Sequence, residues 1–156
     1  MEPFFHALEA TAIGTAVRQS LWLFPVIECF HLLALALLGG TVLAIDLRLL
    51  GWGLRSQPSS ELLRKLQPWM SWALGISIGT GVLMFLSEAI KCYFSPPFWY
   101  KMGLLLLASA FAFTVRRKVA LAEPGRLSPV VVKLTAVVSL ALWFGVGFSG
   151  RWIAFY

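Results

Sequence analysis

Charged side chains are scarce in this chain. Asp, Glu, Lys and Arg make up only 13% of its 156 residues, whereas 59% of the residues are hydrophobic. A soluble domain of this size does not need so much apolar surface, so the composition excludes an ordinary soluble domain. It also argues against nucleic-acid binding, because the net charge of +6 is not arranged as a basic stripe interleaved with aromatic side chains.

Several motifs of enzyme and redox chemistry are also missing. The chain has no Walker loop, no dinucleotide fingerprint, no Cys-x-x-Cys and no hydrolase-like spacing of Ser, Cys and His. Its two cysteines, Cys29 and Cys92, fall in an apolar run and in a loop, so we expect two free thiols. With only His6 and His31, bis-histidine haem ligation needs His6 to fold back or a second subunit.

What the chain has instead is four long apolar runs. They cover residues 21–45, 69–87, 98–115 and 130–150, and each is close to the ~20 residues that a helix needs to cross a bilayer. Residues 1–17, which precede the first run, have one polar and one apolar face, as an amphipathic interfacial helix does. No basic residue precedes Arg18, which does not fit the start of a signal peptide. We predict one all-α membrane domain over residues 1–156, a four-helix transmembrane bundle with a short N-terminal amphipathic helix.

Two connecting segments have recognisable patterns. Residues 58–68 form a short amphipathic piece that Ser59 or Ser60 can cap, and Pro68 can open the second apolar run. The loop at residues 123–129 is rich in turn-forming residues.

The Lys and Arg residues predict an orientation. One side of the membrane would carry Arg48, Arg55, Arg64, Lys65, Arg116, Arg117, Lys118, Arg126 and Lys133, and the other Arg18, Lys91, Lys101 and Arg151. The positive-inside rule places the nine in the cytoplasm. We therefore expect a multi-pass protein of a bacterial inner (cytoplasmic) membrane, with both termini outside and the basic loops facing anionic lipid.

Glu28 and His31 stand inside an otherwise apolar run. An ionisable residue at membrane depth costs at least ~2.5 kcal/mol, so it faces a partner, a cavity or a ligand. Residues three apart share a helix face, and Glu-x-x-His is a known way of presenting metal ligands in a helical bundle. His31 is therefore a candidate metal or haem ligand, a proton relay or a structural histidine. Glu28 is expected to orient its ring.

Other polar residues surround this pair or lie at the opposite end. The same outer half would hold Glu88, Lys91, Lys101 and Arg151. Lys101 either snorkels beside the aromatic belt or contacts an anionic group such as a cofactor carboxylate. At the inner boundary we expect Asp46 and Arg48 to form an ion pair.

Glycine pairs mark two of the apolar runs. Gly75 and Gly79, like Gly39 and Gly40 in the first run, predict close helix packing, which can also leave room for a flat ligand.

Several runs carry a family resemblance. WLFPVIECFHLLALALLGGTVLAIDLRLLG, TGVLMF, FWYKMGLLLLA and GRWIAFY resemble an uncharacterised family of small bacterial four-helix membrane proteins. More distantly, the layout is similar to HemJ-type protoporphyrinogen oxidases and CopD-like copper-resistance proteins. The positions matching the HemJ-type pattern are His31, Gly39 with Gly40, Arg48, and Trp99 with Lys101. That resemblance implies haem b, although the later histidines of that family are absent here.

These observations leave three functions open. The first is a haem b protein for redox chemistry or haem handling, with His31 as axial ligand, Glu28 beside it, and Lys101 or Arg151 at a propionate. The second is a copper or other transition-metal protein, with ligands from His31, Glu28, Cys29 and Met84. The third is a cofactor-free structural membrane subunit. A homodimer and a redox partner are further expectations.

Overall fold

The computed structural model describes residues 2–53 and 56–155, so Arg55 of the charge count lies outside the described residues. This part of the chain is helical and contains no strand. Four helices are long and apolar enough to cross a membrane. They are α3 (Leu23–Leu50), α4 (Ser59–Ser87), the continuous segment Pro96–Leu121 and α8 (Pro129–Trp152). The predicted all-α fold of four spanning helices is confirmed.

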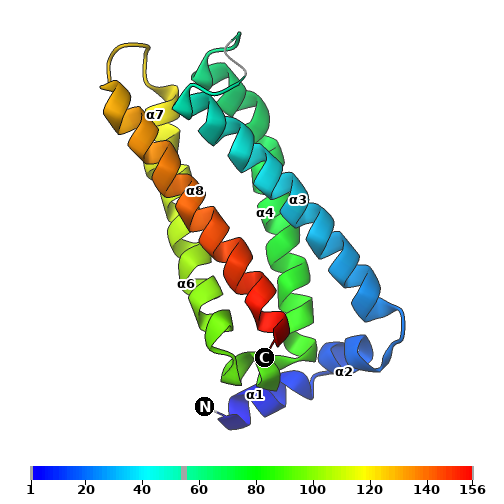
Figure 1. Ribbon diagram of the computed structural model, residues 1–156. Coiled ribbons are helices and arrows are strands. Elements are labelled where there is room, and N and C mark those ends of the chain that lie inside the picture. The colour runs from blue at the N-terminus through cyan, green and yellow to red at the C-terminus, as the bar shows by residue number, and fades with distance from the viewer. Residues whose placement is uncertain (1, 54–55, 156) are drawn as a thin grey trace.

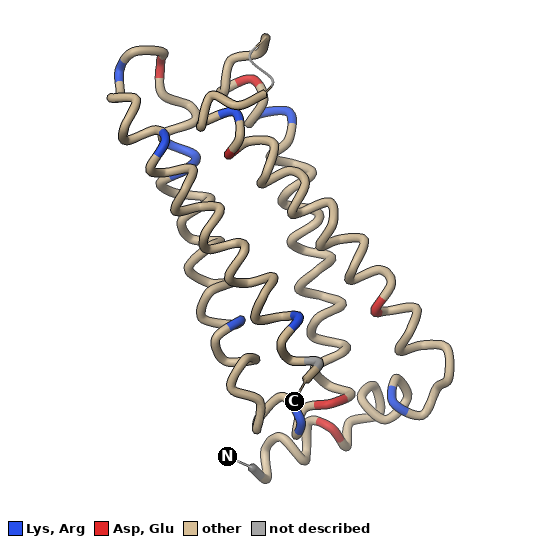
Figure 2. The backbone as a smooth tube through the Cα atoms, in the orientation of Figure 1, with Lys and Arg blue, Asp and Glu red and all other residues tan. Residues whose placement is uncertain are grey.

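The four spans alternate in direction (Figure 1). α3 lies against α4, and α6 (Pro96–Phe111), the first part of the third span, lies against α8. Contacts between α3 and α8 join the two pairs. Both termini lie at the same end of the bundle, where short helices cross beneath the spans (Figure 1). Lys, Arg, Asp and Glu gather toward the two ends and leave the middle of the bundle almost uncharged (Figure 2).

The predicted N-terminal amphipathic helix is two helices, α1 (Glu2–Glu9) and α2 (Ala12–Gln19). Thr11 separates them, because its Oγ1 accepts a hydrogen bond from the Gly14 amide at 3.2 Å and caps α2. A Cβ on Gly14 would overlap the Leu86 carbonyl, so only glycine lets α2 approach the end of α4 this closely. An ion pair between Glu9 and Arg18 links α1 to α2.

Two spans are longer than their apolar runs. α4 begins at Ser59, ten residues before Trp69, and continues through Pro68. Pro68 therefore does not open the helix. Ser59 does not cap it either, because its hydroxyl donates to the Ala120 carbonyl of α7 (Arg117–Leu121) at 3.1 Å. A proline is tolerated here because neighbouring groups in a transmembrane bundle satisfy the freed backbone.

The third span is built from three consecutive segments. α6 (Pro96–Phe111) leads into one π-helical turn, η1 (Ala112–Arg116), and then into α7 (Arg117–Leu121). The span thus ends six residues beyond the apolar run, which stops at Val115. Single π turns inside α-helices are frequent at functional sites, and this one ends on Arg116.

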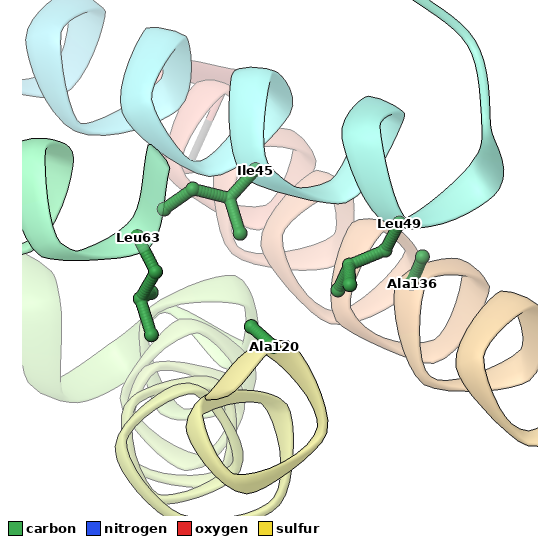
Figure 3. Close-up of a cluster of buried hydrophobic side chains, with 5 residues drawn as sticks. All are labelled: Ile45, Leu49, Leu63, Ala120 and Ala136. Atoms are coloured by element: carbon green, nitrogen blue, oxygen red, sulfur yellow. The ribbon is translucent and has the colours of Figure 1, made fainter. Parts of the chain in front are cut away.

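The packed core occupies the end of the bundle away from the termini. Ile45 and Leu49 of α3 meet Leu63 of α4, Ala120 of α7 and Ala136 of α8 (Figure 3). A second cluster lies deeper, around Leu38, Val42, Met70 and Ala73. Small residues at Ala120 and Ala136 allow these helices to approach closely.

Most of the remaining apolar surface faces outward. Only 11% to 28% of the most apolar stretch of each span is buried within the chain. An exposed apolar surface of this extent is stable only when something apolar covers it, and four spans of this length match a bilayer. The chain is therefore a multi-pass integral membrane protein.

Candidate functional site

His31 lies on the buried side of α3, with 8% of its surface exposed. Its Nδ1 is 2.8 Å from the Thr80 hydroxyl of α4. That hydroxyl has a single hydrogen, and it donates this hydrogen to the Ile76 carbonyl at 2.7 Å. With its hydrogen on this carbonyl, Thr80 accepts from Nδ1–H, and in that tautomer the lone pair of the ring is on Nε2. The Ser77 backbone is a further hydrogen-bond partner of His31.

Gly81 provides space beside this ring. A Cβ at Gly81 would lie 3.4 Å from His31 Cε1, at the limit of ordinary contact. The imidazole is thus held between the threonine that accepts its proton and a residue without a side chain. In the tautomer with the proton on Nδ1, Nε2 is the nitrogen that can serve as an acceptor or a ligand.

Lys101 is a cation whose charge acts on the His31 imidazole. It lies on α6, and its side chain extends along Gly150 of α8: a Cβ there would be 3.5 Å from Lys101 Cε and 3.6 Å from Nζ. His31 and Lys101 are close enough for their charges to interact. None of the four ion pairs among the described residues includes Lys101. A partly buried ammonium without a carboxylate favours an anionic group nearby.

Glu28 does not reach the His31 ring as a hydrogen-bond partner. It is exposed, and it lies only five residues into α3 from Leu23, about 7.5 Å along the helix axis. Its charge still acts on His31, but Thr80 supplies the hydrogen bond that orients the ring. Sequence reasoning missed Thr80, because Thr is common in transmembrane helices and the rotation of α4 depends on packing.

The other predicted outer residues do not converge on His31. Glu88 and Lys91 pair with each other at 3.9 Å. The Arg151 guanidinium lies 5.8 Å from the centre of the Phe155 ring, at the end of α8. Cys29 is exposed. These groups lie apart from one another at this end of the bundle and do not form one common site.

The cysteines are free thiols, as predicted. Cys92 lies in α5 (Ala89–Phe94), a short helix outside the spans. Burial is the main reason that the pKa of its thiol rises to about 11. The thiol therefore stays protonated at neutral pH, which makes it a poor metal ligand.

A second polar cluster, which the sequence did not predict, lies near the opposite end. Arg116 and Asp46 are completely buried, with Arg116 Nη1 3.5 Å from Asp46 Oδ1. Ser139 of α8 donates to Asp46 Oδ2 at 2.6 Å, and Arg116 Nη2 lies 2.8 Å from the Met70 sulfur of α4. One polar cluster thus joins α3, α4, η1 and α8.

The predicted ion pair between Asp46 and Arg48 was wrong. Residues two apart project to different sides of a helix, so they do not face each other. Asp46 points into the bundle, whereas Arg48 Nε donates to the Gln57 carbonyl at 2.7 Å. Arg116 was counted as a loop residue because the third apolar run stops at Val115. The signal available beforehand was that Asp46, within a span, needed a cation at its own depth.

The glycine pairs do not form close helix contacts within the chain. A Cβ at Gly39, Gly40, Gly75 or Gly79 would meet nothing within 4 Å. These glycines face outward, so they pack against lipid or another molecule and not against a helix of the same chain.

No group of three His, Cys, Asp or Glu side chains suited to a metal ion occurs in the described part of the chain. The predicted copper ligands are consequently not brought together around His31.

Comparison with known proteins gives one match. A family model described as a family of unknown function, DUF6644, matches residues 7–156. No curated protein matches the chain, and no solved structure does.

Proposed function

Since the chain belongs to the DUF6644 family, whose function is unknown, we propose from its own side chains that it binds haem b. The proposed axial ligand is His31 Nε2, in the half of the bundle that holds the termini. The observation that carries the proposal is the hydrogen bond between His31 and Thr80 at 2.8 Å. A histidine that ligates a metal almost always donates its other ring N–H to a fixed acceptor, and Thr80 would be that acceptor here.

Two further features fit a haem rather than a bare ion. Lys101 is a partly buried cation without a carboxylate partner among the described residues, and it is electrostatically coupled to His31. A propionate would satisfy it, whereas Arg151, the other predicted contact, lies over the Phe155 ring at the end of α8. Haem would supply one-electron redox chemistry or be the cargo of a handling protein. The chain would supply the imidazole, its orientation and an apolar surround.

This geometry favours haem over a copper site, and the titration described below separates haem binding from a structural role. A copper site would need Glu28 and Cys29 to converge with His31, but both are exposed while His31 is buried. In a cofactor-free structural subunit, the same His31–Thr80 bond would only tie α3 to α4. The comparisons give no support to the expected resemblance to HemJ-type or CopD-like proteins, so the proposal rests on the contacts alone.

The visible spectrum of the purified protein tests the proposal. After titration with haem b in mild detergent, the wild type should show a Soret band with one haem per site. His31→Ala should lose it and still run as a folded species, whereas Cys29→Ser, two residues away and exposed, should keep it. A wild type without a Soret band after titration would overturn the proposal, and so would a His31→Ala protein with the full band.

The remaining expectations are also proposals. The Lys and Arg distribution supports an inner (cytoplasmic) membrane with both termini outside. In a Cys29→Ser background, Lys91→Cys should react with an impermeant thiol reagent in whole cells and Ser128→Cys should not. A homodimer would bring a second copy of His31 or His6 as the other axial ligand. A dimeric protein mass in mild detergent supports it, and a monomer that retains six-coordinate haem contradicts it.

A further inference from the structure

A cationic hollow lies at the end of the bundle away from the termini. It has a volume of about 470 Å³ and is open to the surroundings. Its walls are the last turn of α3, the loop between α7 and α8, and the first turn of α8. Gly51 and Gly125 form its turns with positive φ angles of 83° and 86°, which glycine adopts without strain.

Three cations line this hollow and no carboxylate does. They are Arg48 of α3, Arg126 of the loop and Lys133 of α8. Arg48 is fixed there, because its Nε donates to the Gln57 carbonyl and its two Nη groups remain for other acceptors. None of the three takes part in an ion pair among the described residues. Three unpaired cations from separate segments make the hollow attractive to an anion.

The backbone adds to this attraction. α8 starts at Pro129, which also lines the hollow. The first amides of a helix carry partial positive charge and attract phosphate. The Ser128 hydroxyl accepts from only one of them, the Val131 amide at 3.4 Å.

Apolar side chains line the hollow together with the cations. They are Leu49 and Leu50 of α3, Leu127 of the loop and Val132 of α8. The hollow itself lies where two spanning helices end or begin, at the depth of lipid headgroups. A cationic site with apolar side chains in its walls matches the two parts of a phospholipid.

We propose that this hollow, lined by Arg48, Arg126 and Lys133, binds the headgroup of an anionic glycerophospholipid, with its acyl chains leaving along the apolar side chains of the same walls, Leu50, Leu127 and Val132. Basic pockets between transmembrane helices are known to recognise such headgroups. The phosphodiester would meet the guanidinium groups and the start of α8, and a second negative charge on the headgroup would be neutralised by Lys133. The site is independent of His31 and of any haem.

Native mass spectrometry and thermal unfolding in mixed micelles test this site. Dioleoylphosphatidylglycerol, dioleoylphosphatidylcholine and inorganic phosphate would each be titrated into the full chain. We expect dioleoylphosphatidylglycerol to bind and to raise the unfolding temperature of the protein. The choline lipid, whose headgroup carries no net charge, should bind on the order of tenfold more weakly. Phosphate alone should have no effect at equal concentration. Equal effects of the two lipids, or of lipid and phosphate, would overturn the proposal.

A pair of matched double variants locates the site. Arg126→Gln with Lys133→Gln removes two charges from the hollow. Arg117→Gln with Lys118→Gln removes two exposed charges from α7, at the same end of the bundle but outside the hollow. We expect the first pair to weaken phosphatidylglycerol binding on the order of tenfold and the second to change it less than about twofold. Equal losses would mean diffuse attraction by surface charge, and the proposed site would be wrong.

Discussion

The two ends of the bundle treat buried polar groups in opposite ways. Near the C-terminal end of α3, Asp46 is fully buried, and its two carboxylate oxygens contact Arg116 and Ser139. In the other half, His31 has one ring nitrogen engaged and Lys101 has no ion pair in the part of the chain that the structure describes. Charges that are paired within the chain hold helices together. Polar groups at membrane depth that lack such a partner are available to a ligand. The Asp46 cluster therefore has a structural role, and the half of the bundle that holds His31 is where we propose the ligand site.

The largest expected effect is the loss of stability caused by replacing Asp46. Asp46→Ala leaves Arg116 as a buried charge without its carboxylate, and breaking such a pair costs about 3–5 kcal/mol. We expect a large fall in the yield of folded protein and in the unfolding temperature in detergent. Glu123→Ala, which removes an exposed carboxylate at the same end, should leave both unchanged.

A double variant separates the charge from the packing. Asp46→Ala with Arg116→Met removes both charges, so it should recover much of the stability that Asp46→Ala loses. If Asp46→Ala unfolds at the temperature of Glu123→Ala, the cluster does not hold the bundle, and the contrast between the two ends fails.

The sequence predicted the spans well, because long apolar runs have few alternatives to crossing a membrane. It predicted their ends less well. The stretch from Ser59 to Gln67 is amphipathic yet continues helically into α4 through Pro68. The third span carries Arg116 inside, because a residue after an apolar run can still be buried when the helix continues to Leu121.

The side-chain partners were beyond the sequence for a different reason. Asp46 and Arg116 are 70 positions apart, and His31 and Thr80 are 49 apart. Which residue meets which depends on the rotation of each helix about its axis. Spans with apolar residues on every side give little periodic signal for that rotation. Individual candidates such as His31 and Asp46 stood out, because ionisable residues are rare at this depth, but their partners did not.

A smaller effect is expected from the acceptor of the His31 proton. Thr80→Val keeps the shape of the side chain and removes the oxygen that receives Nδ1–H at 2.8 Å. Loss of such an outer partner typically weakens metal binding by about 10–100-fold, so haem titration followed at the Soret band should show weaker binding by that factor. Thr114→Val is the matched control, since Thr114 is exposed and bonds only the Ala110 carbonyl of its own helix. Equal haem affinity in the two variants would show that Thr80 does not position the ligand.

The smallest and most discriminating effect should come from Lys101. Lys101→Met removes a partly buried ammonium that has no carboxylate partner among the described residues, so the cofactor-free protein should unfold at the same or a higher temperature. The same change should weaken haem binding on the order of tenfold, because a charged contact to a propionate is lost. Lys91→Met, which breaks the exposed pair with Glu88 at 3.9 Å, should change neither quantity appreciably. A purely structural lysine would lower stability on replacement and leave haem affinity unchanged. A higher unfolding temperature together with a lower haem affinity would therefore identify Lys101 as a ligand contact. A lower unfolding temperature with unchanged haem affinity would mean that Lys101, like the Asp46 cluster, has a structural role.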